Sequence, residues 1–128
     1  MATFKRLEDL EVWQIARDLT REIYRLTRTD LFRRDYGLSN QIQRASVSVM
    51  SNIAEGFESE TQAIFISYLN RAKASAGEIR CQLYIANDLG YITKDQFQKA
   101  FQVTESCSRQ LYGFIHYLRS QPNLRRTS

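Results

Sequence analysis

The chain has few of the residues that interrupt helices or make turns between strands. Its 128 residues include five glycines and one proline, Pro122. A β-sandwich or a β-barrel would need more turn residues than this. Aliphatic, aromatic and cysteine residues nevertheless make up 43% of the chain, which is typical of a globular core and excludes a disordered chain. The composition therefore predicts a single all-α domain.

The residues that most often build catalytic and metal sites are also scarce. Two cysteines, Cys81 and Cys107, and one histidine, His116, supply a zinc site poorly. The sequence contains no Ser-His-acid set, glycine-rich phosphate loop, HExxH or CxxC motif. We therefore expect a protein that is not an enzyme and that holds no metal and no cofactor. Since no signal peptide or membrane-length apolar run is visible, we expect a cytoplasmic protein with reduced thiols.

Apolar residues recur at helical spacing in four segments, which predicts an up-and-down antiparallel four-helix bundle over residues 1–120. Residues 121–128 are expected to form a flexible basic tail. The helices are predicted at residues 7–28, 38–56, 60–89 and 94–120, with a loop at 29–37.

Ser59 and Thr93 each precede a Gln by three residues, which predicts two capping boxes. Gly56 is expected to end the second helix in a left-handed conformation. The four apolar stripes are Val12, Ala16, Leu19, Ile23 and Leu26; Leu38, Ile42, Ala45, Val49 and Ile53; Phe65, Leu69, Ala72, Ala76, Ile79, Leu83 and Ala86; and Phe97, Phe101, Thr104, Ser108, Leu111, Ile115 and Leu118, beside Ala100, Cys107 and Phe114.

The predicted second helix carries a further apolar stripe on nearly the opposite face. A helix with two such stripes has a second surface to cover, either in its own domain or on another copy of the chain. We expect this second stripe to be an oligomer interface. A polar strip lies between the two stripes, and we expect its members to pair with Glu78, with an Arg of another helix, or across a subunit boundary. The second stripe consists of Val47, Met50, Ala54 and Phe57, and the polar strip of Gln41, Arg44, Ser48, Asn52 and Glu55.

Arginines repeat along the predicted first helix, although the formal net charge of the chain is only +4. Such a row could follow a phosphate backbone. Asp18 and Glu22 lie between the arginines and favour instead a solvent face of salt bridges. Residues 91–128 hold six Lys and Arg against two acids, so the end of the chain is a second candidate surface for nucleic-acid contact. The candidate nucleic-acid contacts are Arg17, Arg21, Arg25, Arg28, Arg33, Arg34, Arg119, Arg125 and Arg126.

Three short runs carry a resemblance to a known family, namely LEVW at 10–13, YGL at 36–38 and SNIAEG at 51–56. With them the chain resembles the 23S rRNA intervening sequence proteins over nearly its whole length. Met50 and Arg33 stand where members of that family usually have proline. The resemblance implies a homo-oligomeric bundle, with members looking like rings of five, and no enzymatic activity. A distant relative looks like the accessory protein of diversity-generating retroelements, which binds a reverse transcriptase and nucleic acid.

Two functions remain open at this point. The first is a homo-oligomeric module that engages RNA or DNA, or a nucleic-acid enzyme, through a basic surface. The second is a structural scaffold that binds only protein partners. A steep loss of nucleic-acid binding with salt would distinguish the first from the second, because phosphate contacts release counterions.

Overall fold

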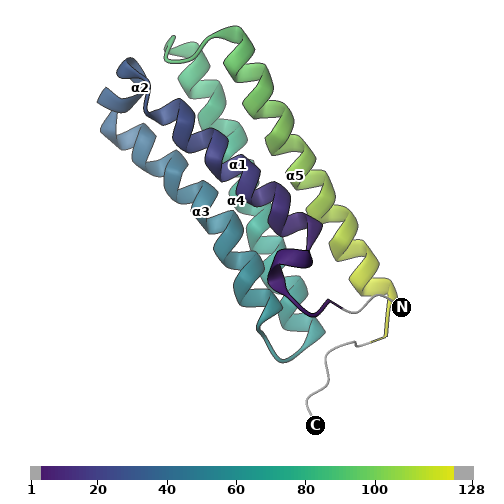
Figure 1. The fold of residues 1–128 in the computed structure, drawn as a ribbon. Helices are drawn as coiled ribbons and strands as arrows, with labels where there is room; N and C mark the ends of the chain where they lie inside the picture. Colours follow the sequence, from purple (N-terminus) through teal and green to yellow (C-terminus); the bar gives the residue numbers. More distant parts are fainter. Residues whose placement is uncertain (1–3, 123–128) are drawn as a thin grey trace.

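The computed structural model describes residues 4–122, and Figure 1 shows that they form an elongated bundle of helices. The elements are a 3₁₀ turn η1 (Leu7–Asp9), α1 (Glu11–Thr27), a short α2 (Asp30–Arg34), α3 (Tyr36–Phe57), α4 (Gln62–Asp88) and α5 (Lys94–Ser120). Helix α1 packs beside α3 and α5, and α4 packs beside the same two helices, so α1 and α4 are diagonal in the bundle. No strand occurs in the described part of the chain. The predicted antiparallel four-helix bundle is thus confirmed.

The core is built from the apolar stripes that the sequence shows. All the stripe residues of α1 and α4 are buried, as are those of α3 except Leu38, which is half-buried. Helix α5 differs slightly, because Phe97, Phe101 and Ser108 are only half-buried while Ala100 and Cys107 are buried. Small residues on α4, such as Ala72 and Ala76, are completely buried, which lets neighbouring helices approach closely.

One predicted capping box is confirmed and the other is wrong. At the start of α5, the Thr93 hydroxyl accepts a bond from Gln96 N (3.1 Å), and the Gln96 side chain accepts one from Thr93 N (2.8 Å). Helix α4 is capped by Thr61, whose hydroxyl accepts from Ile64 N at 3.1 Å, rather than by Ser59. The Ser59 hydroxyl donates backward to the carbonyl of Gly56 and so closes the turn that precedes α4.

The segment 29–37 is not simply the predicted loop, since α2 occupies most of it and α3 already begins at Tyr36. Asp35 caps α3 by accepting from Leu38 N at 3.1 Å. The other oxygen of this carboxylate accepts from the hydroxyl of Tyr91, which follows α4, at 2.9 Å. This hydrogen bond raises the pKa of Tyr91, because the neutral phenol is the donor. The α2–α3 junction is therefore joined to the α4–α5 connection at one end of the bundle.

Gly56 does not end α3 in a left-handed conformation, as the sequence suggested. It lies inside α3, and among the described residues only Gly90 has a positive φ, of 74°. A Cβ atom at Gly56 would lie 2.8 Å from Phe65 Cδ1 and 2.9 Å from Tyr68 Cβ. Glycine is needed here because α3 and α4 approach each other closely.

A row of aromatic rings crosses the other end of the bundle. Phe4, before η1, meets Phe114 of α5 edge-on at 5.4 Å between ring centroids. Phe114 meets Phe65 of α4 at 5.6 Å, and Phe65 meets Phe57 of α3 at 6.3 Å. The Gln62 side-chain amide donates to the carbonyl of Leu118 at 2.6 Å at the same end. These contacts connect three helices and the N-terminal segment.

Candidate nucleic-acid interface

The outer face of α1 carries the arginines that the sequence singles out. The opposite face of the helix is buried in the core, so Arg17, Arg21, Arg25 and Arg28 are all exposed. The exposed Arg33 and Arg34 of α2 follow in the chain. Arg119 is exposed on α5, and Arg125 and Arg126 lie outside the described residues. The fold therefore gathers the arginines of α1 but leaves Arg119 on another helix.

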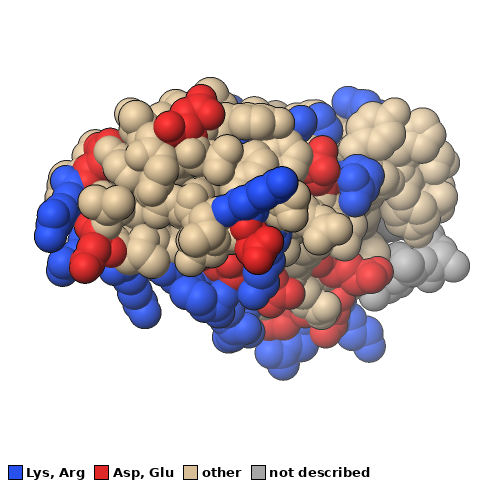
Figure 2. All heavy atoms as spheres, turned by 90° about the horizontal axis from the view of Figure 1, so that it is seen from above, with Lys and Arg blue, Asp and Glu red and all other residues tan. Residues whose placement is uncertain are grey.

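Acidic residues neutralise part of this face. The Arg21 guanidinium lies 3.9 Å from the Asp18 carboxylate, and both side chains are well exposed, so this pair contributes little. Glu22 is different, because its side chain is only 8% exposed and is held by Arg25 and by Lys99 Nζ of α5, at 3.7 Å. Figure 2 shows basic and acidic side chains interleaved along the lower edge of the molecule. The salt-bridged interpretation is thus correct for Asp18 and Glu22.

Other arginines of the set keep their charge available. Arg33 is the exception, because its guanidinium lies 3.4 Å from the exposed carboxylate of Asp30. Arg28 and Arg34 make no ion pair among residues 4–122. The Arg17 guanidinium lies 5.6 Å from the centre of the Trp13 ring, which positions it without neutralising it. Residues 11–28 hold four arginines against Glu11, Asp18 and Glu22, so the surplus along α1 and its C-cap is one positive charge.

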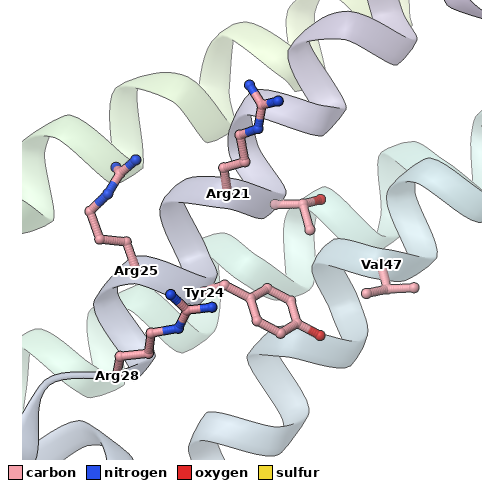
Figure 3. A pocket seen from close by; sticks show the side chains of 6 residues that line it. Arg21, Tyr24, Arg25, Arg28 and Val47 are labelled. Carbon is pink, nitrogen blue, oxygen red and sulfur yellow. The ribbon is translucent and has the colours of Figure 1, made fainter.

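A groove of about 490 Å³ lies between α1 and α3 beside these arginines. In Figure 3 the ring of Tyr24 points from α1 toward α3, where Val47 lies. Arg28 extends toward this ring, whereas Arg25 extends away from it. The groove thus presents basic groups and an aromatic ring together, and Tyr24 is not among the candidate residues that the sequence pattern singles out. Its lining residues are Thr20, Arg21, Tyr24, Arg25, Arg28 and Val47.

The second apolar stripe of α3 is largely covered by the chain itself. Met50 and Phe57 are half-buried and pack against the core, and Ala54 is also half-buried. Val47 is 42% exposed and is the member of the stripe that faces solvent most. Of the two explanations for this stripe, contact within the domain accounts for Met50 and Phe57. An interface with another copy stays a prediction that depends mainly on Val47.

The polar strip divides into two parts. Ser48 and Ser75 of α4 share a hydrogen bond of 2.9 Å, and the Asn52 amide donates to the Ser48 carbonyl at 2.8 Å. Arg44, Glu55 and Glu78 are exposed, and none of them makes an ion pair among the described residues. The expected pairing of Arg44 and Glu55 within the chain is therefore wrong, because these side chains are exposed, while Ser48 bonds to α4 and Asn52 bonds to Ser48 of its own helix. Pairing across a subunit boundary stays a prediction.

The described residues contain no group of three or more His, Cys, Asp or Glu side chains placed to hold a metal ion. None of the described helices is long and apolar enough to cross a membrane.

The two cysteines differ in burial. Cys81 is exposed, whereas Cys107 is buried, and its burial raises the pKa of the Cys107 thiol to about 12. Such a thiol is not a nucleophile at neutral pH.

Comparison with known proteins supports the fold and the family. A crystal structure of a protein of unknown function from the S23 ribosomal protein family, from Bacteroides thetaiotaomicron, is similar to this chain with a TM-score of 0.76. The two share 24% sequence identity over 82% of this chain and 95% of the other. No curated protein matches the sequence significantly. The family model described as 23S rRNA-intervening sequence protein matches residues 8–113. The chain therefore belongs to the 23S rRNA-intervening sequence protein family.

Proposed function

We propose that the protein is a non-enzymatic module that binds nucleic acid through the basic face of α1. The observation that carries this proposal is the groove between α1 and α3, which Arg21 and Arg28 line and where Arg28 extends toward the ring of Tyr24. Guanidinium groups bind phosphate oxygens by paired hydrogen bonds, and an aromatic ring beside them can contact a base. Arg25 is occupied by the buried Glu22, so Arg21 and Arg28 are the better candidates for phosphate contact.

The proposal includes self-association of the chain. One chain offers few uncompensated charges, and its non-specific affinity should be on the order of 10⁻⁴–10⁻⁶ M at physiological salt. A ring, the assembly that the family resemblance implies, would repeat the basic face around an axis, so that weak contacts add by avidity. Val47, which lines the α3 side of the groove, is the surface residue we assign to this contact between copies, so the contact would border the groove.

Fluorescence anisotropy with labelled RNA and DNA, over a series of salt concentrations, tests the proposal. The double variant Arg21→Gln/Arg28→Gln removes two charges from the groove and leaves the Glu22 pair intact. We expect weaker binding to every sequence and a flatter salt dependence, by about 0.7 to 0.9 in slope per lost phosphate contact. The matched control Arg71→Gln/Lys94→Gln removes two exposed charges from α4 and α5 and should bind more tightly than the groove variant. Equal losses in the two variants would contradict the assignment of the groove.

A scaffold that binds only protein is the alternative function. Exposed apolar side chains favour it where they are neighbours, as Ile85 and Leu89 are at the end of α4, because contiguous apolar surface marks protein contacts. The exposed apolar side chains include Leu31, Ile64, Ile85 and Leu89, which are 53%, 43%, 41% and 54% exposed. A nucleic-acid enzyme such as a reverse transcriptase belongs instead to the first function, as a further partner of the basic surface. The absence of binding to RNA and DNA at low salt, with an intact assembly, would favour this alternative.

A further inference from the structure

Helix α5 carries an exposed pair of stacked aromatic side chains that takes no part in the core. The rings of Tyr112 and His116 are nearly parallel, with an angle of 13° between their planes and 6.2 Å between their centroids. Tyr112 is 62% exposed, and His116 is exposed one turn further along the helix. Exposed aromatic surface of this kind offers a face on which another planar group can stack.

Positive charge predominates around this pair, where the nearest acid along α5 is the half-buried Glu105, seven residues before Tyr112. The sequence contains no Asp or Glu from residue 106 onward, while Arg109 and Arg119 are exposed on the same helix. Neither arginine makes an ion pair among residues 4–122. The arginines on the outer face of α1 are compensated to a greater extent, because acidic residues lie between them. The end of α5 thus combines uncompensated positive charge with aromatic surface.

The pair lies on the side of α5 that borders α4. Phe101, Ser108, Tyr112 and Arg119 follow one another at spacings of seven, four and seven residues, which places them on one line along the helix. Phe101 fixes the direction of this line, because its ring contacts that of Tyr84 of α4, with centroids 5.3 Å apart. The acids Asp9 and Glu11 instead line a hollow on the α1 side of α5, together with Gly113.

Helix α4 extends the aromatic surface along the same line. Tyr84 is 51% exposed, and the guanidinium of Arg80 lies 5.5 Å from the centre of the Phe101 ring. Eleven residues of helix separate Phe101 from Tyr112, which corresponds to about 16 Å. An extended strand of a few nucleotides could therefore contact an aromatic side chain at each end of this face and Arg109 between them, where the half-buried Glu105 is the one acid on α5 from Phe101 to Tyr112.

We propose that this face, with Tyr84, Arg109, Tyr112, His116 and Arg119, is a stacking platform for single-stranded nucleic acid. The inference rests on the proposed function and specifies its substrate class. A duplex buries its bases within its own stack, so aromatic side chains on a convex helix surface reach only unpaired bases. The face is exposed and positively charged, and a polyanion with free bases complements both properties.

Anisotropy measurements with an oligothymidylate and with a DNA duplex of the same length test the platform. Tyr112→Leu keeps the side chain apolar but removes the ring, and we expect about tenfold weaker binding to the single strand. Binding to the duplex should stay unchanged. Tyr112→Phe, which keeps the ring, should bind like the original protein. Tyr36→Leu is the matched control, because Tyr36 is 78% exposed at the start of α3 and lies outside the platform.

Any other result of these measurements refutes the platform, and the kind of result shows whether the proposed function is refuted with it. If the single strand binds normally to Tyr112→Leu, or if both substrates lose affinity equally, the platform is refuted while nucleic-acid binding stands. If the original protein binds neither substrate, both proposals fail. If Tyr112→Leu instead changes the sedimentation coefficient, the face is a contact between protein chains and the platform is refuted.

Discussion

Replacement of Gly56 by alanine tests the close packing of α3 against α4. The added methyl group would meet Phe65 Cδ1 at 2.8 Å, Tyr68 Cβ at 2.9 Å and the Phe65 carbonyl oxygen at 3.1 Å. Carbon atoms in contact normally lie about 3.5–4.0 Å apart, so one helix must move by roughly half an ångström or more. Two of these three atoms belong to the backbone or to a Cβ, and they cannot move aside by a rotamer change.

The two terms of this substitution have opposite signs. Overpacking of a tight contact costs about 1–3 kcal/mol, whereas alanine in a helix is favoured over glycine by about 0.5–1 kcal/mol. We therefore expect Gly56→Ala to lower the free energy of unfolding by about 1–2 kcal/mol. For a domain of this size the melting temperature should fall by about 3–8 °C. Circular dichroism at a single fixed protein concentration measures both quantities.

Gly77 in α4 is the matched control. A Cβ atom there would have no other atom within 4 Å, so only the helix-propensity term applies. Gly77→Ala should raise the free energy of unfolding by about 0.5–1 kcal/mol. A Gly56→Ala variant as stable as the original protein would refute the packing argument, especially if Gly77→Ala gained the expected stability.

Three further predictions concern single side chains. Glu22→Gln should lower the free energy of unfolding by about 1–2 kcal/mol, because it removes the negative charge of the buried carboxylate that binds Arg25. Asp18→Asn, at an exposed pair, should change the free energy of unfolding by less than about 0.5 kcal/mol. A thiol reagent at pH 8 should modify one cysteine per folded chain, because Cys81 is exposed while burial raises the pKa of Cys107 to about 12. Two thiols that react quickly in the folded chain would contradict this prediction. Val47→Glu should dissociate the assembly in sedimentation experiments without unfolding the chain, and an unchanged assembly would exclude Val47 from the interface.

Helical periodicity predicts the fold well because each helix buries one stripe. The α4 stripe from Phe65 to Ala86 is a case in which every expected core position is buried. The ends of the helices are harder to predict, since a cap depends on local hydrogen bonds. Ser59 and Thr61 are both acceptable caps by type, and only the turn that Ser59 closes onto Gly56 makes Thr61 the cap of α4.

The candidate site is predicted less completely. Exposure of the arginines follows from their position opposite the α1 stripe, and the Asp18 and Glu22 pairs follow from their spacing. The contact between Glu22 and Lys99 could not be predicted, because it joins α1 to α5. For the same reason the groove and the role of Tyr24 required the packing of α1 against α3. A partner for Glu55 within the chain was predicted incorrectly, because its place between two apolar stripes does not show that the side chain is exposed.

The aromatic row from Phe4 to Phe57 has a consequence for local opening of the bundle. Helix ends usually fray, so their amide hydrogens exchange quickly with solvent. Here rings from the N-terminal segment, α5, α4 and α3 meet in succession, and the Tyr91–Asp35 hydrogen bond joins two connections at the opposite end. Unwinding one helix end would expose ring surface on its neighbours. Exchange near both ends should therefore be slow and should occur in several helices together, as one cooperative opening event.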